Sequence, residues 1–451
     1  MRASDILKNL NQEQKQAVLH KNGPLLILAG PGSGKTKTLT HKIAYLIATG
    51  ISPENILALT FTNKAAQEMK QRIFHLLREA PPQSKIKALT MGTFHSFGAM
   101  ILRSAANWQN RNARFVIYDD YDALALIKEA FKEADISKDD FQPQAIRNAI
   151  SKLKTDLLAP EALKDRIQSH FDEIVYRIYK IYESLLEKNN AFDFDDLIMK
   201  AVLYLESRPD ALRFWQDKFQ YILVDEYQDT NYSQYVLTKR LAQKYKNLTV
   251  VGDEDQSIYS FRMADYRNIL NFERDFPQAK IIVLGQNYRS TKTIVEASAH
   301  LIKNNQFRSP KNLWTQKEAG EPIFLGQFED EKQEAMAVAW TIKNLVGSRY
   351  KYSDCAILYR TNAQSRVLEE AFLKEGLSYN LVGDISFYER KEVKDIIAYL
   401  KFLHNPSDTL SLKRVLNVPP RGIGEKTAAL ILPWARFILE APDKIAKNLP
   451  A

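Results

Sequence analysis

The chain repeats one pattern of hydrophobic and polar positions: a short apolar run, then a polar loop, then a stretch with helical periodicity. Five such segments have an apolar run without alternation, namely "PLLILAGPGSGKT" (24–36), "NILALTFTNKAAQEMKQRI" (55–73), "YILVDEYQDTN" (221–231), "NLTVVGDEDQSIY" (247–259) and "KIIVLGQNYRST" (280–291). Runs of this kind are typical of parallel strands that are covered on both faces. The sequence therefore predicts an open α/β sheet, whose ligands bind at the carboxyl ends of the strands.

The same pattern divides the chain into regions. Strands and loops predict a first α/β domain over residues 1–96 and 212–282. Long helical stretches with hardly any strand signal predict a helical insertion over 97–211. A second series of apolar runs, "PIFLGQF", "DCAILYRTN" and "SYNLVGD", predicts a second α/β region over 283–383, and a helical pattern returns over 384–451.

Composition adds less to this picture. Lys and Arg (63) exceed Asp and Glu (54), which mildly favours a polyanionic partner such as nucleic acid. No run reaches the ~18 apolar residues that a membrane span needs, and the first residues hold no apolar signal core, so we expect a cytoplasmic protein with no membrane partner. The single cysteine, Cys355, is expected to be a small buried residue of a strand.

The segment "AGPGSGKT" has the form of a P-loop, with Ala29 where the strict pattern has glycine. Its glycines let successive backbone N–H groups face phosphate oxygens at a helix N-terminus. Lys35 is expected to reach the β- and γ-phosphates, and the Thr36 hydroxyl to ligate Mg²⁺. The predicted nucleotide-binding residues of this segment are Ala29, Gly30, Pro31, Gly32, Ser33, Gly34, Lys35, Thr36 and Lys37.

A second strand supplies the acids that such a site needs. In "YILVDEYQDTN", Asp225 and Glu226 follow the apolar run directly. Proteins bind Mg²⁺ through one or two carboxylates, so Asp225 is the expected metal ligand. Glu226 is expected to orient and deprotonate the attacking water. Together the two segments predict an ATPase or a GTPase.

Ten short motifs follow one another in order along the chain. They are "LNQEQKQAV" (10–18), "AGPGSGKT" (29–36), "LTFTNKAAQEM" (59–69), "GTFHSF" (92–97), "AFDFDDL" (191–197), "LVDEYQDTN" (223–231), "VVGDEDQSIY" (250–259), "QNYRST" (286–291), "ILYRTNAQSRVLEE" (357–370) and "PPRGIGEKT" (419–427). The series resembles the UvrD/Rep/PcrA-type superfamily-one DNA helicases over essentially the whole chain. The resemblance implies two RecA-like lobes with ATP between them, each with a helical insertion. It also implies 3′ to 5′ translocation along single-stranded DNA, coupled to strand separation in DNA repair and replication.

The resemblance assigns further residues to the ATP site. It implies that Gln14 hydrogen-bonds the adenine and that Tyr288 stacks on it. It also implies that Gln256 senses the γ-phosphate and that Arg289 places positive charge on it from the second lobe. Phosphoryl transfer depends mainly on such positioning and electrostatics. Gln256 and Arg289 therefore join Lys35 and Glu226 in the expected catalytic set, with ATP and Mg²⁺ as cofactors.

The resemblance also implies a track for single-stranded DNA, which proteins hold with stacking aromatics and with polar groups on the phosphates. Phe61, Tyr259 and Phe261 match base-contacting positions, although an aromatic after a strand is more often a core residue. Thr62, Asn63, His95 and Arg262 are candidates for backbone contacts, and Arg421, Gly422 and Gly424 are candidates for holding the duplex at a single-strand to double-strand junction. His95 could equally be a hydrogen-bonded structural residue.

The sequence departs from the family pattern in several places, two of which bear most on function. The loop "DEDQSIYSFRMA" stands where the family has "DDDQSIYGWRGA", so Phe261 replaces a tryptophan and weaker stacking is expected. The chain also stops inside the second insertion, before any segment like the family's "EERRLxYVxxTRA". We therefore expect an incomplete second lobe, and a second chain could supply the missing part.

Three interpretations compete. The leading one is an ATP-dependent 3′ to 5′ DNA helicase or translocase. The second is an ATP-dependent module that binds single-stranded DNA but does not unwind duplexes alone. A third, another P-loop class such as a transporter ATPase, leaves "TFTNKAA" unexplained and would need an "LSGGQ"-like signature that the sequence lacks.

Overall fold

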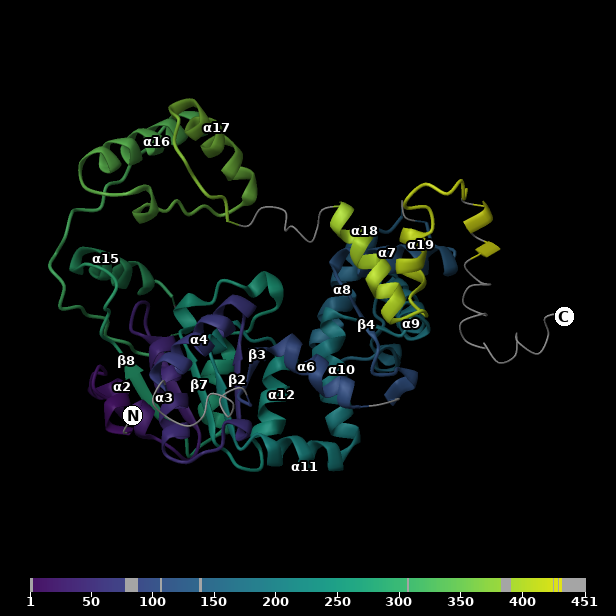
Figure 1. Ribbon diagram of the computed structural model, residues 1–451, viewed down its shortest axis with the longest axis horizontal. Helices are drawn as coiled ribbons and strands as arrows, with labels where there is room; N and C mark the ends of the chain where they lie inside the picture. Colours follow the sequence, from purple (N-terminus) through teal and green to yellow (C-terminus); the bar gives the residue numbers. More distant parts are fainter. Residues whose placement is uncertain are drawn as a thin grey trace. The chain divides into compact units, whose positions relative to one another are not determined.

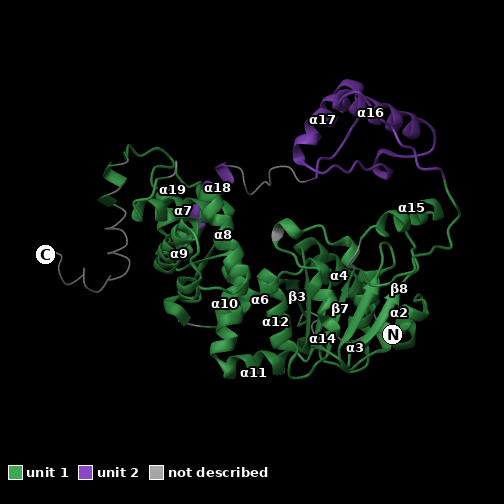
Figure 2. Cartoon of the chain, turned by 180° about the vertical axis from the view of Figure 1, so that it is seen from behind, with its two compact units in different colours: residues 1–320, 401–451 green, residues 321–400 purple. Residues whose placement is uncertain are grey.

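The computed structural model describes residues 3–77, 88–105, 108–137, 140–305, 308–382, 391–424, 426–428 and 430–431. The chain divides into two compact units (Figure 2), residues 1–320 with 401–451 and residues 321–400. The first unit contains a parallel sheet and a helical region, and the second is built around two helices.

Six parallel strands form the central sheet of the first unit (Figure 1), in the order β3-β2-β6-β7-β1-β8. The strands are β1 (Leu25–Ala29), β2 (Ile56–Thr60), β3 (Thr90–Thr93), β6 (Tyr221–Val224), β7 (Leu248–Gly252) and β8 (Lys280–Leu284). Each of the five apolar runs forms one of these strands, and the prediction of a parallel α/β sheet is confirmed. The loops after β1, β2, β6, β7 and β8 all leave the same edge of the sheet.

Both faces of this sheet are covered, and β1 shows how. Leu25 and Ile27 belong to one buried cluster, whereas Leu26 and Leu28 belong to another. The first cluster is shared with α2 (Gln12–Leu19), α3 (Lys35–Ala48) and α4 (Asn63–Leu76), and the second with α6 (Phe94–Ser104), α10 (Phe194–Ser207) and α12 (Tyr232–Ala242). Because successive strand residues point to opposite faces, burial on both faces requires an unbroken apolar run.

A helical region interrupts the sheet in the sequence. Its further elements are α7 (Asp120–Glu133), α8 (Pro143–Thr155), α9 (His170–Lys188), α11 (Pro209–Lys218) and a two-stranded sheet of β4 (Val116–Tyr118) with β5 (Ala191–Asp193). At its centre the fully buried Lys154 ammonium lies 2.8 Å from Glu183 and Asp193 and 2.9 Å from Asp196. These charges hold α8, α9 and α10 together. The domain limits predicted above stay a prediction.

Short helices complete the first unit. They are α1 (Ala3–Ile6), α13 (Arg267–Leu270), α14 (Phe272–Asp275), α15 (Lys292–Ile302) and α19 (Thr409–Val415), with α18 (Lys391–His404) ending in it. Residues 401–415 pack on the helical region, because Asn405 Nδ2 donates to the Asn189 carbonyl at 2.8 Å and Tyr118 Oη donates to Asp408 at 2.5 Å.

The second unit departs from the sequence prediction. It contains α16 (Glu331–Ser348) and α17 (Ser365–Glu375), which bury Ala335, Ala339, Ala371 and Phe372 between them. The predicted strand series is wrong for this structure, because the described residues of "PIFLGQF", "DCAILYRTN" and "SYNLVGD" form no strand.

The exposure of these segments explains the difference. Phe324, Leu325 and Leu358 are 89, 92 and 94% exposed. A strand needs a backbone partner, and the described part of this unit gives these segments none, although Ile357 packs against the cluster of α16 and α17. Cys355 is accordingly half-buried in an irregular segment rather than buried in a strand.

One prediction concerns the contact between α6 and α10. A Cβ atom on Gly98 would lie 2.1 Å from the Leu197 carbonyl oxygen, so Gly98→Val must force the two helices apart. We expect the free energy of unfolding, measured by urea denaturation, to fall by about 2 kcal/mol or more. Gly424→Val is the matched control, because a Cβ there meets nothing within 4 Å. Equal stability of the two variants would contradict this account of the packing.

Candidate functional site

The P-loop connects β1 to α3 and requires glycine at the position directly before the helix. Gly34 has a φ of +87° at the N-cap of α3, a conformation that strains other residues. A Cβ there would also lie 2.8 Å from Gln14 Nε2. Ser33 Oγ donates to the Gly30 carbonyl at 2.6 Å and closes the loop. The sequence-predicted P-loop is therefore formed at the carboxyl end of a strand and at the start of a helix.

The Lys35 side chain brings three parts of the chain together. Its ammonium group donates to Gln256 Oε1 at 2.9 Å and lies 3.0 Å from Glu226 Oε2. Lys35 starts α3, Glu226 follows β6, and Gln256 ends the short helix η5 (Glu254–Gln256) after β7. The side chain of Lys35 is only 10% exposed, so these contacts are made in a largely dehydrated setting.

The acids after β6 crowd against the P-loop. Thr36 Oγ1 donates to Asp225 Oδ2 at 3.3 Å. Burial, followed by the charge of Glu226, raises the pKa of Asp225 to about 6. The same two causes raise the pKa of Asp229 to about 6. Negative charge at this position is therefore costly unless a cation compensates it.

This arrangement fits a divalent cation. Among the described residues no group of three or more His, Cys, Asp or Glu side chains is placed to hold a metal ion. Mg²⁺ does not need such a cage, because it uses one or two protein oxygens together with water and substrate phosphates. Asp225 Oδ2 and Thr36 Oγ1 are the two protein oxygens that fit it.

Glu226 is held in an uncommon backbone conformation. Its φ is +50°, which costs of the order of 1–3 kcal/mol for a residue other than glycine. Gln228 Nε2 donates to Glu226 Oε2 at 2.9 Å and Lys35 pairs with the same oxygen. The conformation therefore aims the carboxylate back toward the P-loop.

The two predicted adenine contacts lie around Asn11. Gln14 is buried, its Nε2 donates to the Ser33 carbonyl at 2.9 Å, and its side chain caps α2 together with Asn11. Tyr288 is half exposed; burial raises its pKa, and a hydrogen bond with Asn11 opposes that shift. The structure brings Gln14 and Tyr288 together beside the P-loop, whereas their contact with a base stays a prediction.

The "QNYRST" segment after β8 also contacts the P-loop. Asn287 Nδ2 donates to the Pro31 carbonyl at 2.7 Å, and the Tyr288 N–H donates to the Gly32 carbonyl at 2.9 Å. The Cβ of Arg289 would lie 2.8 Å from a Cβ on Gly32. Arg289 is therefore attached beside the phosphate loop, and its role stays a prediction. The Lys37 ammonium donates to the Asn9 carbonyl.

The three aromatic residues predicted to contact bases form one cluster. The rings of Phe61 and Tyr259 stack with centroids 5.1 Å apart and an interplanar angle of 24°. The Tyr259 and Phe261 rings lie 5.9 Å apart, and Phe261 is 63% exposed. Phe61 follows β2, Tyr259 is the N-cap of η6 (Ser260–Arg262) after β7, and Phe261 lies within η6. They are not core residues, because Phe61 and Tyr259 are half-buried and Phe261 is exposed.

The candidates for phosphate contacts have different surroundings. Thr62 caps α4 by accepting from the Ala65 N–H at 3.1 Å, and Asn63 is exposed at the start of that helix. The His95 ring lies edge-on to Phe194 at 5.8 Å. Burial lowers the pKa of His95, so the ring is neutral at pH 7 and contributes no positive charge. The Arg262 side chain lies outside the described residues.

In the predicted duplex-binding turn, the arginine side chain donates hydrogen bonds to nearby backbone carbonyl groups. Arg421 Nη1 donates to the carbonyls of Val415, Leu416 and Val418 at 2.7, 3.0 and 3.1 Å. These bonds satisfy carbonyl groups at the C-terminal end of α19. Gly422 has a φ of +71°, and a Cβ on Gly424 would meet nothing within 4 Å. The turn is therefore open on the side of its glycines, and its DNA contact stays a prediction.

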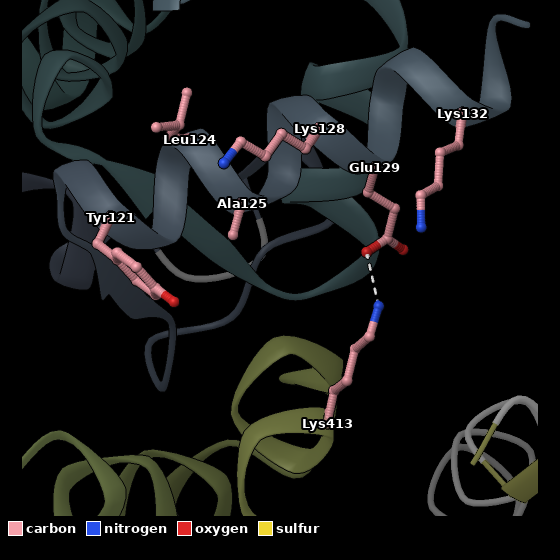
Figure 3. A pocket seen from close by; sticks show the side chains of 7 residues that line it. All are labelled: Tyr121, Leu124, Ala125, Lys128, Glu129, Lys132 and Lys413. Atoms are coloured by element: carbon pink, nitrogen blue, oxygen red, sulfur yellow. Dashed lines mark ion pairs between the residues drawn. The ribbon is translucent and has the colours of Figure 1, made fainter. Parts of the chain in front are cut away.

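A hollow lies in the helical region, between α7 and α19 (Figure 3). Its volume is about 300 Å³, and Lys413 reaches across it to within 4.0 Å of Glu129. Tyr121, Leu124, Ala125, Lys128 and Lys132 complete the lining. None of the residues predicted from the sequence lies there.

Some residues that hold the site were not predicted. Asn287 and Gln228 lie inside two of the recognised motifs, and this position is the only feature of the sequence that could have indicated their role. Leu313 gave no signal at all, although its side chain touches Gly30 closely enough to exclude a Cβ there. Contacts of this kind join residues hundreds of positions apart and leave no local pattern.

Comparison with known proteins places this site in a family. A model of the UvrD/REP helicase N-terminal domain matches residues 10–277, and one of the UvrD-like helicase C-terminal domain matches residues 282–448. Both domain models match residues of this chain, and these matches give no support to the expected second chain. Among the described residues, no helix is both long enough and apolar enough to cross a membrane.

Relatives named ATP-dependent DNA helicase PcrA are similar over most of the chain. The protein from Staphylococcus epidermidis is 48% identical over 95% of this chain, and that from Bacillus subtilis is 48% identical over 96%. The protein from Staphylococcus aureus is 47% identical over 95%. The chain spans 58% of the length of each of these relatives. Because the model of the N-terminal domain matches more than half of the residues of this chain, the chain belongs to the UvrD/Rep helicase family.

Proposed function

We propose that this chain binds ATP with Mg²⁺, hydrolyses it, and uses the energy to move 3′ to 5′ along single-stranded DNA and to separate DNA strands in repair and replication. The observation that carries the proposal is the position of the Lys35 ammonium, 3.0 Å from Glu226 and 2.9 Å from Gln256. This one group joins the phosphate loop to the acids of β6 and to the loop that carries the exposed aromatics. We expect this activity in the cytoplasm, because the similar proteins come from bacteria.

The residues of the P-loop hold the nucleotide in this proposal. The backbone N–H groups at the start of α3 face the phosphates, and Lys35 neutralises the β- and γ-phosphates. Thr36 and Asp225 would hold Mg²⁺, which would supply positive charge to the phosphate oxygens. A phosphate that reaches Lys35 competes with Glu226, and the released carboxylate can then accept a proton from water. Arg289 adds positive charge to the transferred group.

The aromatic cluster holds the DNA strand. Bases stack on aromatic rings whatever their sequence, so the cluster of Phe61, Tyr259 and Phe261 suits a protein that moves along single strands. Gln256 and Tyr259 lie three residues apart in the same loop. Movement of the Gln256 side chain with the phosphate can therefore shift the rings that hold the strand.

A second candidate is favoured by the second unit. Its described residues include no strand, and a cavity of about 980 Å³ opens beside residues 355–359 and 377–382. A unit whose described residues form no sheet differs from the second RecA-like lobe that unwinding is expected to need, which suits an ATP-dependent clamp on single-stranded DNA. Strand displacement on a duplex with a 3′ tail separates the two candidates, because clear unwinding by the purified chain excludes the clamp.

The first prediction concerns catalysis. Lys35→Ala and Glu226→Gln should each lower ATP turnover in the presence of single-stranded DNA by about a hundredfold or more, because one removes the phosphate charge and the other the base. Phosphate release measures the effect. The matched controls are Lys292→Ala and Glu296→Gln, which alter an exposed ion pair on α15 and should keep wild-type turnover. Wild-type turnover that does not respond to single-stranded DNA would refute the proposed motor.

The second prediction concerns stacking. Phe261→Ala should weaken binding of a fluorescent single-stranded oligonucleotide by about fivefold or more, because a base–aromatic stack contributes ~1–3 kcal/mol. Phe261→Trp should tighten binding, since indole offers a larger face. Phe214→Ala removes an aromatic of similar exposure on α11 and should have no effect. The DNA track is wrong if Phe261→Ala and Phe214→Ala bind alike.

A further inference from the structure

A buried lysine lies behind the loop that carries Gln256. Lys311 belongs to the irregular segment after α15, and its side chain is only 1% exposed. Its ammonium pairs with Asp253, with Glu254 Oε2 at 2.9 Å and with Asp255 Oδ2 at 3.1 Å. Three consecutive acids therefore share one buried cation, although 56 to 58 residues of chain separate them from it.

Neighbouring residues of the same segment strengthen this attachment. Arg308 pairs with Asp255 at 2.9 Å, and the Ser309 N–H donates to Glu254 Oε1 at 2.6 Å. Two residues beyond Lys311, Leu313 packs on Gly30 of the P-loop. Residues 308–313 thus contact both the acidic residues 253–255 after β7 and the P-loop.

The Lys311 ammonium keeps its charge although it is buried. Burial alone lowers the pKa of Lys311, but the carboxylates of Asp253 and Glu254 outweigh burial and raise the pKa above its usual value. The lysine therefore carries its charge at pH 7. Removing one partner from a buried ion pair leaves an uncompensated charge, which is strongly unfavourable.

Hydrogen bonds continue from Lys311 to the P-loop. Asp253 Oδ1 faces Lys311, and Asp253 Oδ2 accepts from Gln256 Nε2 at 2.6 Å. Gln256 Oε1 in turn accepts from Lys35 Nζ at 2.9 Å. A carboxylate can only accept, so Asp253 fixes which end of the Gln256 amide faces Lys35. The chain of contacts runs from Lys311 through Asp253 and Gln256 to Lys35.

We propose that Lys311 is a positioning residue for ATP hydrolysis, which holds Asp253 so that Gln256 presents its amide correctly to the phosphate loop. This inference rests on the proposed ATPase function. Lys311 touches neither Lys35 nor the phosphate loop itself, so it acts only through Asp253 and Gln256. Its loss should impair the rate of hydrolysis more than the binding of ATP.

The test compares Lys311→Met and Lys311→Arg with the wild-type chain. Nucleotide sites are first titrated with a fluorescent ATP analogue. Turnover is then expressed per binding site, so unfolded protein does not lower the measured kcat. We expect Lys311→Met to lower kcat per site by about tenfold and to change KM for ATP by less than about threefold. Lys311→Arg keeps the charge and should recover kcat to within about threefold of wild type. Lys303→Met, an exposed lysine after α15, should match wild type.

A purely structural role predicts a different result. If Lys311 only stabilises the fold, kcat per site in Lys311→Met stays within about twofold of wild type while the number of sites falls, and the proposal is overturned. Should Lys311→Met yield no folded protein, Lys311→Gln keeps a hydrogen-bond donor and is judged by the same two outcomes. Wild-type turnover without DNA stimulation contradicts the proposed motor alone, because the Lys311 comparison is still measured on basal turnover. Absence of any wild-type turnover overturns both.

Discussion

The buried ammonium group of Lys35 is the charge around which the site is organised. Asp225, Glu226 and Asp229 gather at the end of β6, and burial raises the pKa of Asp225 and Asp229 to about 6. Without a cation these acids repel one another in a poorly hydrated setting. Lys35 compensates part of that charge and also donates a hydrogen bond to Gln256 Oε1. The loops after β1, β6 and β7 therefore depend on one side chain for their mutual arrangement.

Much of the first unit could be predicted from local pattern. The apolar runs at β1, β2, β6 and β7 are unbroken because both faces of each strand are covered, and this requirement is visible in the sequence. The edge strand β8 buries Ile282 and Leu284 on one face and leaves Ile281 and Val283 exposed on the other. Edge strand β3 was missed, because its residues, Thr90–Thr93, include no apolar run. The P-loop and the acids after β6 could be predicted as neighbours because their residue types follow from the chemistry of phosphate and Mg²⁺, and the structure brings Thr36 and Asp225 together. Their ligands stay a prediction.

Long-range polar contacts could not be predicted in the same way. Lys311 carries no motif, and only the fold places it beside Asp253. The guanidinium of Arg421 also makes contacts that its motif did not indicate, with carbonyl groups of its own turn, and its DNA contact stays a prediction. The strands expected in the second unit failed for a related reason. A run such as "PIFLGQF" indicates an apolar segment, whereas strand formation also needs a partner backbone, which the described residues of that unit do not supply.

The central claim is that the loop from Asp253 to Phe261 couples the phosphate site to the aromatic cluster, and Gln256→Ala tests it most directly. ATP turnover and ATP affinity are measured with and without single-stranded DNA, beside Gln243→Ala, an exposed glutamine after α12. The account predicts that DNA stimulation of turnover falls by about tenfold or more while ATP affinity changes by less than about threefold. Equal losses of stimulation and of ATP affinity would contradict coupling through this loop.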